Sequence, residues 1–188
     1  MTGKTSISKL IAAAILVISV ATVKAQTSLR PGEALVAGAV NPNTNKTPIY
    51  FIDSVRLKPG KQRIFSNEEV AAITMYKDSV AIAKAGPDAK DGVIYVETPA
   101  FVKKRYNALF IAKNPSYAKL AEGFIDEGNI EYILNNNLFE GSLEVTFAPV
   151  TAQNLKSLRI IGKDQLAKEF GIKDKKYGVV ITVAMEAQ

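Results

Sequence analysis

The feature that most constrains this fold is one pattern of secondary structure that occurs twice, at an offset of about 82 to 86 residues. The segment 49–54 begins with four apolar or aromatic residues and ends in turn formers, and 131–136 follows the same plan. Both segments are typical of a buried strand that runs into a turn. The chain is therefore expected to build one small unit twice.

After this strand, each copy offers a residue that can begin a helix. Ser66 and Glu69 have the spacing of a capping box, and Thr151 stands at the matching place in the second copy. We expect a short helix after each of these caps. A second strand is then predicted over 73–77 in the first copy and over 158–162 in the second.

A second short helix is predicted in each copy, over 78–85 and over 163–170. Asp78 and Asp164 are the expected N-cap residues, because their side chains can accept a hydrogen bond from a backbone N–H of the first turn. The two helices occupy the same place in the order of elements, which supports the comparison of the two copies.

Glycines mark the later part of each copy. Gly86 and Gly171 directly follow the predicted helices, where a residue with positive φ is favoured. A polar loop then leads to a Gly-Val pair and a β-rich stretch, which begins at Gly92 in the first copy and at Gly178 in the second. The second loop is therefore expected to be one residue longer than the first.

These patterns predict an α+β fold of two repeated βαβαβ units, each with a small mixed sheet and short helices. The units are expected over 47–98 and 130–188, after an extended lead-in over 26–46. Between them, 99–129 is predicted to form a helical connection, because Pro115 can occupy the first turn of a helix. A unit of about 50 residues has a thin core, so the two units are expected to pack together.

Residues 1–25 have the order of a secretory signal peptide. Lys4 and Lys9 precede an almost unbroken apolar run over 10–23, and Ala25 fits the position before a cut. The run is about 14 residues, shorter than the roughly 20 that a helix needs to cross a bilayer. The chain is therefore predicted to be periplasmic or otherwise exported, with no stable membrane span after cleavage. Retention of the segment as an anchor is the alternative.

Composition excludes several classes of function. The chain has 24 basic and 18 acidic residues, and three of the lysines lie in the predicted signal peptide. A net charge of about +3 after cleavage does not indicate a nucleic-acid partner. The chain has no histidine and no cysteine, which removes the commonest general base and the thiol nucleophile. We therefore assign no catalytic, cofactor-binding or metal-binding residue, and we do not expect an enzyme.

Two groups of charged residues have alternative interpretations. Asp88 and Asp91 offer oxygens to a calcium ion, but a complete calcium-binding loop is missing from the sequence, and a solvated loop is the simpler interpretation. Two basic segments offer a surface for anionic lipid or polysaccharide, although solvated charge is again the simpler interpretation. Their cations are Lys103, Lys104 and Arg105 in the first segment and Lys173, Lys175 and Lys176 in the second.

Three stretches of the first copy, Pro48–Asp53, Glu69–Asp78 and Gly92–Ile94, resemble the core of the plug domain of TonB-dependent outer-membrane receptors. The second copy is more diverged, with Asn135 where that family prefers aspartate. Such receptors also need a barrel of about 22 strands, for which this chain has no room. The resemblance implies a free-standing plug-like fold in the cell envelope, and does not imply a transporter.

The positions that define the repeat are a strand tyrosine, the turn residue after the strand, and two glycines. They are Tyr50, Asp53, Gly86 and Gly92 in the first copy, and Tyr132, Asn135, Gly171 and Gly178 in the second. The tyrosines are interpreted as core residues. The favoured hypothesis is a non-catalytic module that binds an envelope protein, by addition of a strand at an exposed sheet edge. The alternative is a soluble envelope protein that binds a small ligand.

Overall fold

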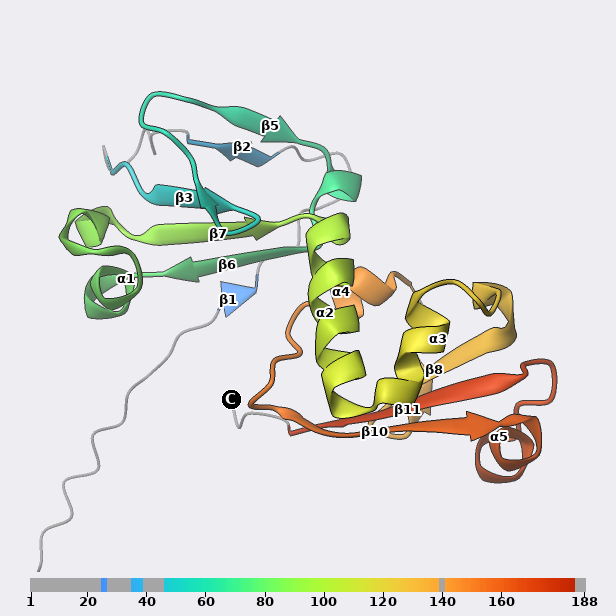
Figure 1. Ribbon diagram of the computed structural model, residues 1–188. Coiled ribbons are helices and arrows are strands. Elements are labelled where there is room, and N and C mark those ends of the chain that lie inside the picture. Colours follow the sequence, from blue (N-terminus) through green and yellow to red (C-terminus); the bar gives the residue numbers. More distant parts are fainter. Residues whose placement is uncertain (1–24, 27–34, 39–45, 139–140, 185–188) are drawn as a thin grey trace, which may run out of the picture.

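The computed structural model describes residues 25–26, 35–38, 46–138 and 141–184. Within these ranges the chain has an α+β architecture of small mixed sheets and short helices, as predicted (Figure 1). One sheet belongs to each half of the chain, and the helix α2 (Pro99–Lys113) runs from the first sheet to the second.

The first sheet has the strand order β1-β6-β7-β3-β4. Its central strand β7 is parallel to β3 and antiparallel to β6, and β4 returns antiparallel to β3. A separate pair of antiparallel strands, β2 and β5, packs apolar residues against one face of this sheet. The elements of this half are β1 (Ala25–Gln26), β2 (Leu35–Ala37), β3 (Ile49–Ile52), β4 (Val55–Arg56), β5 (Arg63–Phe65), η1 (Asn67–Glu69), β6 (Ala72–Tyr76), α1 (Asp78–Ala85), η2 (Pro87–Asp91) and β7 (Val93–Glu97).

The second sheet has the strand order β10-β11-β8-β9. Its central strand β11 is parallel to β8 and antiparallel to β10, and β9 returns antiparallel to β8, so order and orientation are those of β6-β7-β3-β4. This shared topology is a property of the fold, and its origin in a duplication stays a prediction. The elements of this half are β8 (Ile130–Leu134), β9 (Asn137–Leu138), α4 (Leu143–Phe147), β10 (Leu155–Gly162), α5 (Lys163–Phe170) and β11 (Tyr177–Val183).

The registers of the two sheets also correspond. Tyr50 on β3 lies opposite Ile94 on β7, and Tyr132 on β8 lies opposite Val179 on β11. Since the two tyrosines occupy matching positions, Ile94 and Val179 are equivalent residues of the central strands. The predicted match of Gly92 with Gly178 is therefore wrong by one residue.

Gly92 and Gly178, which the sequence pattern matched, occupy different positions relative to their strands. Gly92 precedes β7 and has a φ of 102°, which glycine adopts without strain. Gly178 lies inside β11 opposite Glu131, and the equivalent position of β7 is Val93 opposite Ile49. The two glycines are therefore required for different reasons. Gly92 allows a backbone conformation with positive φ, and Gly178 leaves space for Leu166 of the helix α5.

The short helices agree with the predicted bounds, but their N-caps do not. Lys77 and Gly162 are the N-cap residues of α1 and α5, and neither makes a side-chain capping bond. Asp78 and Asp164 lie instead within the first turn, where a negative charge is favoured by the helix dipole.

The helices predicted after Ser66 and Thr151 are much shorter in the structure. The first is the 3₁₀ helix η1, and the second is only a turn over 152–154. In the first unit, Glu69 Oε2 accepts a hydrogen bond from the Ser66 backbone N–H at 2.9 Å. In the second unit, Asn154 Oδ1 accepts from the Thr151 N–H at 2.8 Å, and Thr151 Oγ1 accepts from the Asn154 N–H at 3.3 Å. Since these reciprocal bonds close a tight turn at once, strand β10 begins at Leu155, ahead of its predicted start at Leu158.

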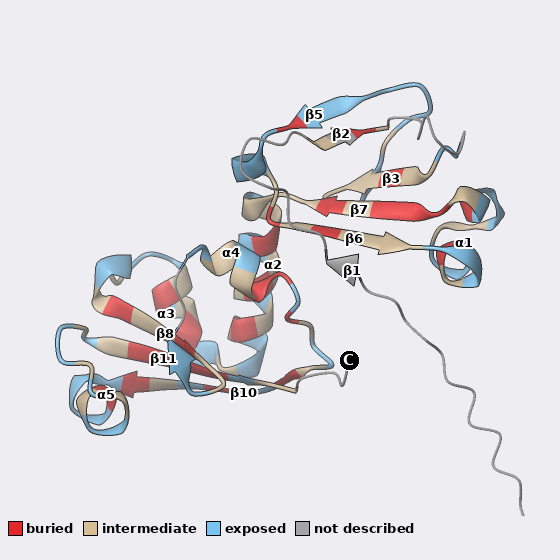
Figure 2. Ribbon diagram, turned by 180° about the vertical axis from the view of Figure 1, so that it is seen from behind, coloured by how far each residue is buried: buried red, intermediate tan, exposed pale blue. Residues whose placement is uncertain are grey.

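The connection between the units is helical and supplies three of the four buried aromatic residues of the largest core. It consists of α2, η3 (Pro115–Tyr117), α3 (Ala118–Ala121) and η4 (Glu127–Asn129). Aromatic side chains of this connection meet Phe147 of α4, with ring centroids 5.2 Å apart for both Tyr106 and Phe110. Ala71, next to β6, also packs into this cluster, so the two units share apolar contact. Figure 2 shows buried positions along α2, which lies between the two sheets.

The predicted signal peptide and the predicted lead-in lie largely outside the described residues. The predicted signal peptide lies there except for Ala25, which forms β1 with Gln26, so the predicted cut falls within this strand. Of the lead-in over 26–46, the structure describes Gln26, residues 35–38 and Lys46. Within the described ranges, no helix combines the length and the apolar character that crossing a bilayer requires.

Candidate interaction site

The turn after the first strand of each unit has the same backbone conformation. Asp53 and Ser54 have φ values of 49° and 68°, and Asn135 and Asn136 have φ values of 49° and 65°. Two consecutive residues with positive φ are typical of the tight turn that joins two antiparallel strands, where Asn and Asp are tolerated. The sequence positions chosen as turn residues are therefore placed at turns.

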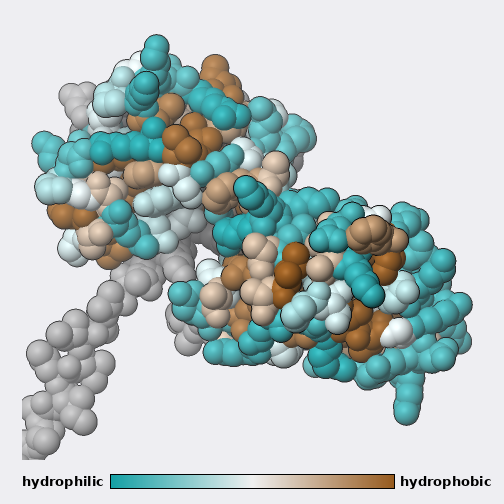
Figure 3. Space-filling model, in the orientation of Figure 1, coloured by the Kyte–Doolittle hydropathy of each residue, from teal (hydrophilic) through white to brown (hydrophobic). Residues whose placement is uncertain are grey.

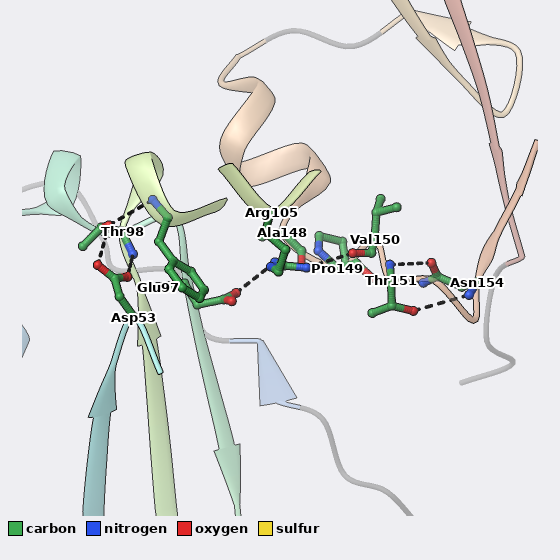
Figure 4. Close-up of polar contacts among 10 residues, drawn as sticks. Asp53, Glu97, Thr98, Arg105, Ala148, Pro149, Val150, Thr151 and Asn154 are labelled. Carbon is green, nitrogen blue, oxygen red and sulfur yellow. Dashed lines mark hydrogen bonds and ion pairs between the residues drawn. The ribbon is translucent and has the colours of Figure 1, made fainter. Parts of the chain in front are cut away.

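The side chains of Asp53 and Asn135 also form hydrogen bonds at the end of the central strand of their sheets. Asp53 Oδ1 accepts from the Thr98 backbone N–H at 2.8 Å, and Asp53 Oδ2 accepts from the Thr98 hydroxyl at 2.8 Å (Figure 4). Thr98 Oγ1 in turn accepts from the Phe101 N–H and caps the start of α2. In the second unit, Asn135 Oδ1 accepts from the Val183 N–H at 2.9 Å. The turn of the first unit is thus linked to the connecting helix.

Substituting Asp53 by alanine is expected to lower the free energy of unfolding by about 2 kcal/mol, because two hydrogen bonds to a carboxylate are lost and the Thr98 N–H loses its acceptor. Asp53→Asn keeps one acceptor oxygen and should cost less. Urea denaturation of both variants measures the difference. Equal losses for the two substitutions would show that the hydrogen bonds to Thr98 are not the cause.

A single guanidinium group joins the two units. Arg105 of α2 donates from Nη2 to Glu97 Oε2 at 3.1 Å, at the end of β7 in the first unit. It also donates to two backbone carbonyls of the second unit, from Nη2 to Ala148 at 2.7 Å and from Nη1 to Val150 at 2.9 Å (Figure 4). The side chains of Arg105 and Glu97 are only 26% and 23% exposed, so this contact is shielded from water.

Burial at this junction outweighs the attraction of Arg105 and raises the pKa of the Glu97 carboxyl. A raised pKa means that the folded state favours the protonated form, so this contribution to stability is present at low pH and is lost as pH rises through the raised pKa. The stability of the natural protein should therefore fall, relative to Glu97→Gln, as pH rises from about 4, near the ordinary pKa of a glutamate, through the raised pKa. Chemical denaturation across this range tests the sign, and a relative gain with rising pH would contradict it.

The strand tyrosines are core or half-buried residues. Tyr50 is buried against β2 and β5 in the first unit. Tyr132 is half-buried, and its hydroxyl lies 3.1 Å from that of Tyr117. Because the Tyr117 hydroxyl donates to Asn107 Oδ1, Tyr132 is the donor in the pair, and burial raises its pKa. Neither tyrosine presents an open ring to a ligand.

The carboxylates of the loop before β7 have protein partners. Asp88 forms an ion pair with Arg56, and Asp91 Oδ2 accepts from the Thr47 N–H at 3.3 Å. The described residues contain no cluster of three or more acidic, histidine or cysteine side chains that could hold a metal ion. The solvated-loop interpretation fits these contacts.

The basic segments are not uniform patches of solvated charge. Lys103 forms an ion pair with Glu127, and Lys175 donates to the Gly128 carbonyl. Arg105, which the sequence interpretation left in solvent, is the shielded residue of the junction. The sequence Lys103-Lys104-Arg105 does not indicate which of the three side chains is shielded from solvent. Thr98 was also missed, although a threonine before Pro99 has the pattern of an N-cap followed by proline.

Exposed apolar side chains are spread over both units. In Figure 3 they form small brown areas separated by polar residues on the visible face. The largest exposed ones in the described part of the chain are Val55, Ile64, Ile82, Phe124, Leu138 and Val145. This face has no large continuous apolar area, whereas a strand edge offers unpaired backbone groups, so the edges of the sheets are the better candidates for an interaction site.

The edge strands of the two sheets differ in length and in whether another strand pairs with them. Strands β4 and β9 are two residues long, which leaves little backbone to pair. In the first sheet, β1 pairs with the outer edge of β6, with Ala25 opposite Met75 and Gln26 opposite Thr74. The eight-residue strand β10 is the equivalent of β6, and no strand of the described residues pairs with its outer edge (Figures 1 and 2).

Comparison with known protein families, with curated proteins and with solved structures finds no match to this chain.

Proposed function

We propose that this chain is a non-catalytic protein-interaction module of the bacterial cell envelope and a free-standing relative of receptor plug domains. The observation that carries the proposal is the outer edge of β10, an eight-residue strand with which no described strand pairs. The equivalent strand β6 has five residues and is paired with β1, of which the predicted cut would remove Ala25. An unpaired strand edge offers rows of backbone donors and acceptors, and binding by strand addition uses such rows. The signal-peptide pattern of residues 1–25 supports the envelope location.

The test is chemical crosslinking of the tagged full-length chain in living cells, followed by purification from the envelope fraction and mass spectrometry. We expect the purified chain to have lost residues 1–25 and to be crosslinked reproducibly to one envelope protein. An intact N-terminus in the cytoplasmic fraction would reject the location. Recovery of abundant proteins alone, at the level of an untagged control, would reject the interaction.

A further inference from the structure

We infer that the outer edge of β10 binds an extended acidic peptide of a partner protein, which joins the second sheet as an antiparallel strand. The inference rests on the proposed function and assigns its surface, the chemistry of the partner and the direction of binding.

The direction of the backbone groups shows which residues of β10 are available. The carbonyl of Ile181 on β11 accepts a hydrogen bond from the turn between β8 and β9, so the backbone of Ile181 faces β8. Because these directions alternate along a strand, the backbone of Val180 faces β10, where it lies opposite Arg159. The backbone groups of Leu158 and Ile160 therefore face away from the sheet.

An observed contact agrees with this assignment. Asn114, at the end of α2, donates from Nδ2 to the Leu158 carbonyl at 3.3 Å from outside the sheet ladder. The described residues supply no such donor or acceptor to the backbone of Ile160. Toward the described part of the chain, Ile160 thus has both an unpaired N–H and an unpaired carbonyl, which is the pair that an added strand requires.

The first sheet shows how such an edge is filled. Ile160 lies opposite Val179, and Met75, at the equivalent position of β6, lies opposite Ile94. Met75 is paired with Ala25 of the antiparallel strand β1. A peptide on β10 in the same arrangement would run antiparallel and would exchange its central hydrogen bonds with Ile160.

The positive charge on and next to β10 indicates that the bound peptide is acidic. From 151 to 163 the chain has three cations, Lys156, Arg159 and Lys163, and no carboxylate. Arg159 is already paired with Glu169 of α5, while Lys156 is exposed at an irregularity in the β10–β11 pairing. Lysine on an edge strand opposes pairing with a second basic strand, so a second copy of β10 is disfavoured and an acidic peptide is favoured.

The probe is a fluorescein-labelled peptide of eight alternating glutamate and valine residues with blocked ends, and its control has lysine in place of glutamate. We expect saturable binding of the glutamate peptide to the chain beginning at Ala25, which keeps β1 on the first sheet, at least tenfold tighter than binding of the lysine peptide, by fluorescence anisotropy. Lys156→Glu should weaken this binding at least fivefold. The matched charge reversal Lys58→Glu, at an exposed lysine of the first unit, should leave it unchanged.

Ile160→Pro tests the backbone contact, because proline removes the outward N–H and spares the hydrogen bonds to β11. In a variant whose circular dichroism and melting show a folded protein, binding should be lost. If the variant does not fold, slowed hydrogen exchange of the Ile160 amide on addition of the glutamate peptide replaces it. Unchanged binding in folded Ile160→Pro, or unchanged exchange at Ile160, overturns the inference.

Other results also decide the question. No binding of either peptide, equal binding of both, or a dimer that Lys156→Glu disrupts would each overturn the acidic-peptide inference. The envelope crosslinking experiment, repeated with Lys156→Glu, separates the two proposals. If this variant retains the same partner, the module still binds proteins but uses another surface. If the natural chain captures no partner, the proposed function itself fails.

Discussion

Substituting Gly178 by valine is expected to lower the free energy of unfolding by about 3 kcal/mol, because the position has no space for a side chain. A Cβ atom at Gly178 would lie 2.8 Å from Leu166 Cδ1 and 2.9 Å from Ile161 Cγ1. The measurement is urea denaturation followed by circular dichroism. Gly162→Val is the control for the added side chain, because a Cβ there meets nothing within 4 Å. It should cost about 1 kcal/mol, clearly less than Gly178→Val, because valine is a poorer N-cap than glycine at the start of α5.

The first unit suggests how this loss can be reversed. It has the opposite distribution of size, with Val93 on the strand where the second unit has Gly178, and a small residue, Ala81, on the helix that packs there. Leu166→Ala alone should cost about 3 kcal/mol, because it leaves a cavity beside β11. Combined with Gly178→Val, it should be clearly less harmful than the sum of the two single losses. Simple additivity would contradict this account of the packing.

Arg105→Met is expected to cost about 3 kcal/mol, because it leaves the shielded Glu97 carboxylate and two carbonyls of the second unit without their donor. The loss should be smaller when Glu97→Gln is added, since no unpaired charge then remains at the junction. Denaturation curves of the single and double variants give the coupling energy.

The same experiment tests whether Arg105 holds the two units together. We expect the unfolding transition to be broader, or divided in two, in Arg105→Met than in the natural chain, because the apolar contact near Ala71 is then left without the hydrogen bonds of Arg105. A sharp transition with unchanged stability would show that the apolar contact alone joins them.

Local sequence signals were enough to place most regular elements. The bounds of α1 and α5 follow from short apolar patterns that stop at Gly86 and Gly171, and both glycines have positive φ in the structure. The register of the central strands was harder, because the matching Gly-Val pairs suggested an equivalence that Gly92 and Gly178 do not have. A glycine needed for its φ and a glycine needed for space look the same in a sequence.

The candidate site could be predicted only as a class. Strand addition at an exposed edge follows from the presence of small sheets, but the sequence does not say which edge stays unpaired. That depends on where β1 pairs and on the short turn between Thr151 and Asn154, which lengthens β10. The role of Arg105 depends on contacts with residues far along the chain, in the second unit, and local patterns carry no record of such contacts.

Hydrogen bonds at the start and in the middle of α2 connect this helix to both units. Thr98, held by Asp53, caps the start of α2, and Arg105 two turns later holds the second unit. A helix of 15 residues is about 22 Å long and resists bending. A displacement of the β3–β4 hairpin, which carries Asp53, should therefore move α2 and with it the second sheet. Any partner that pulls on the edge of β10 would in the same way move the opposite half of the protein.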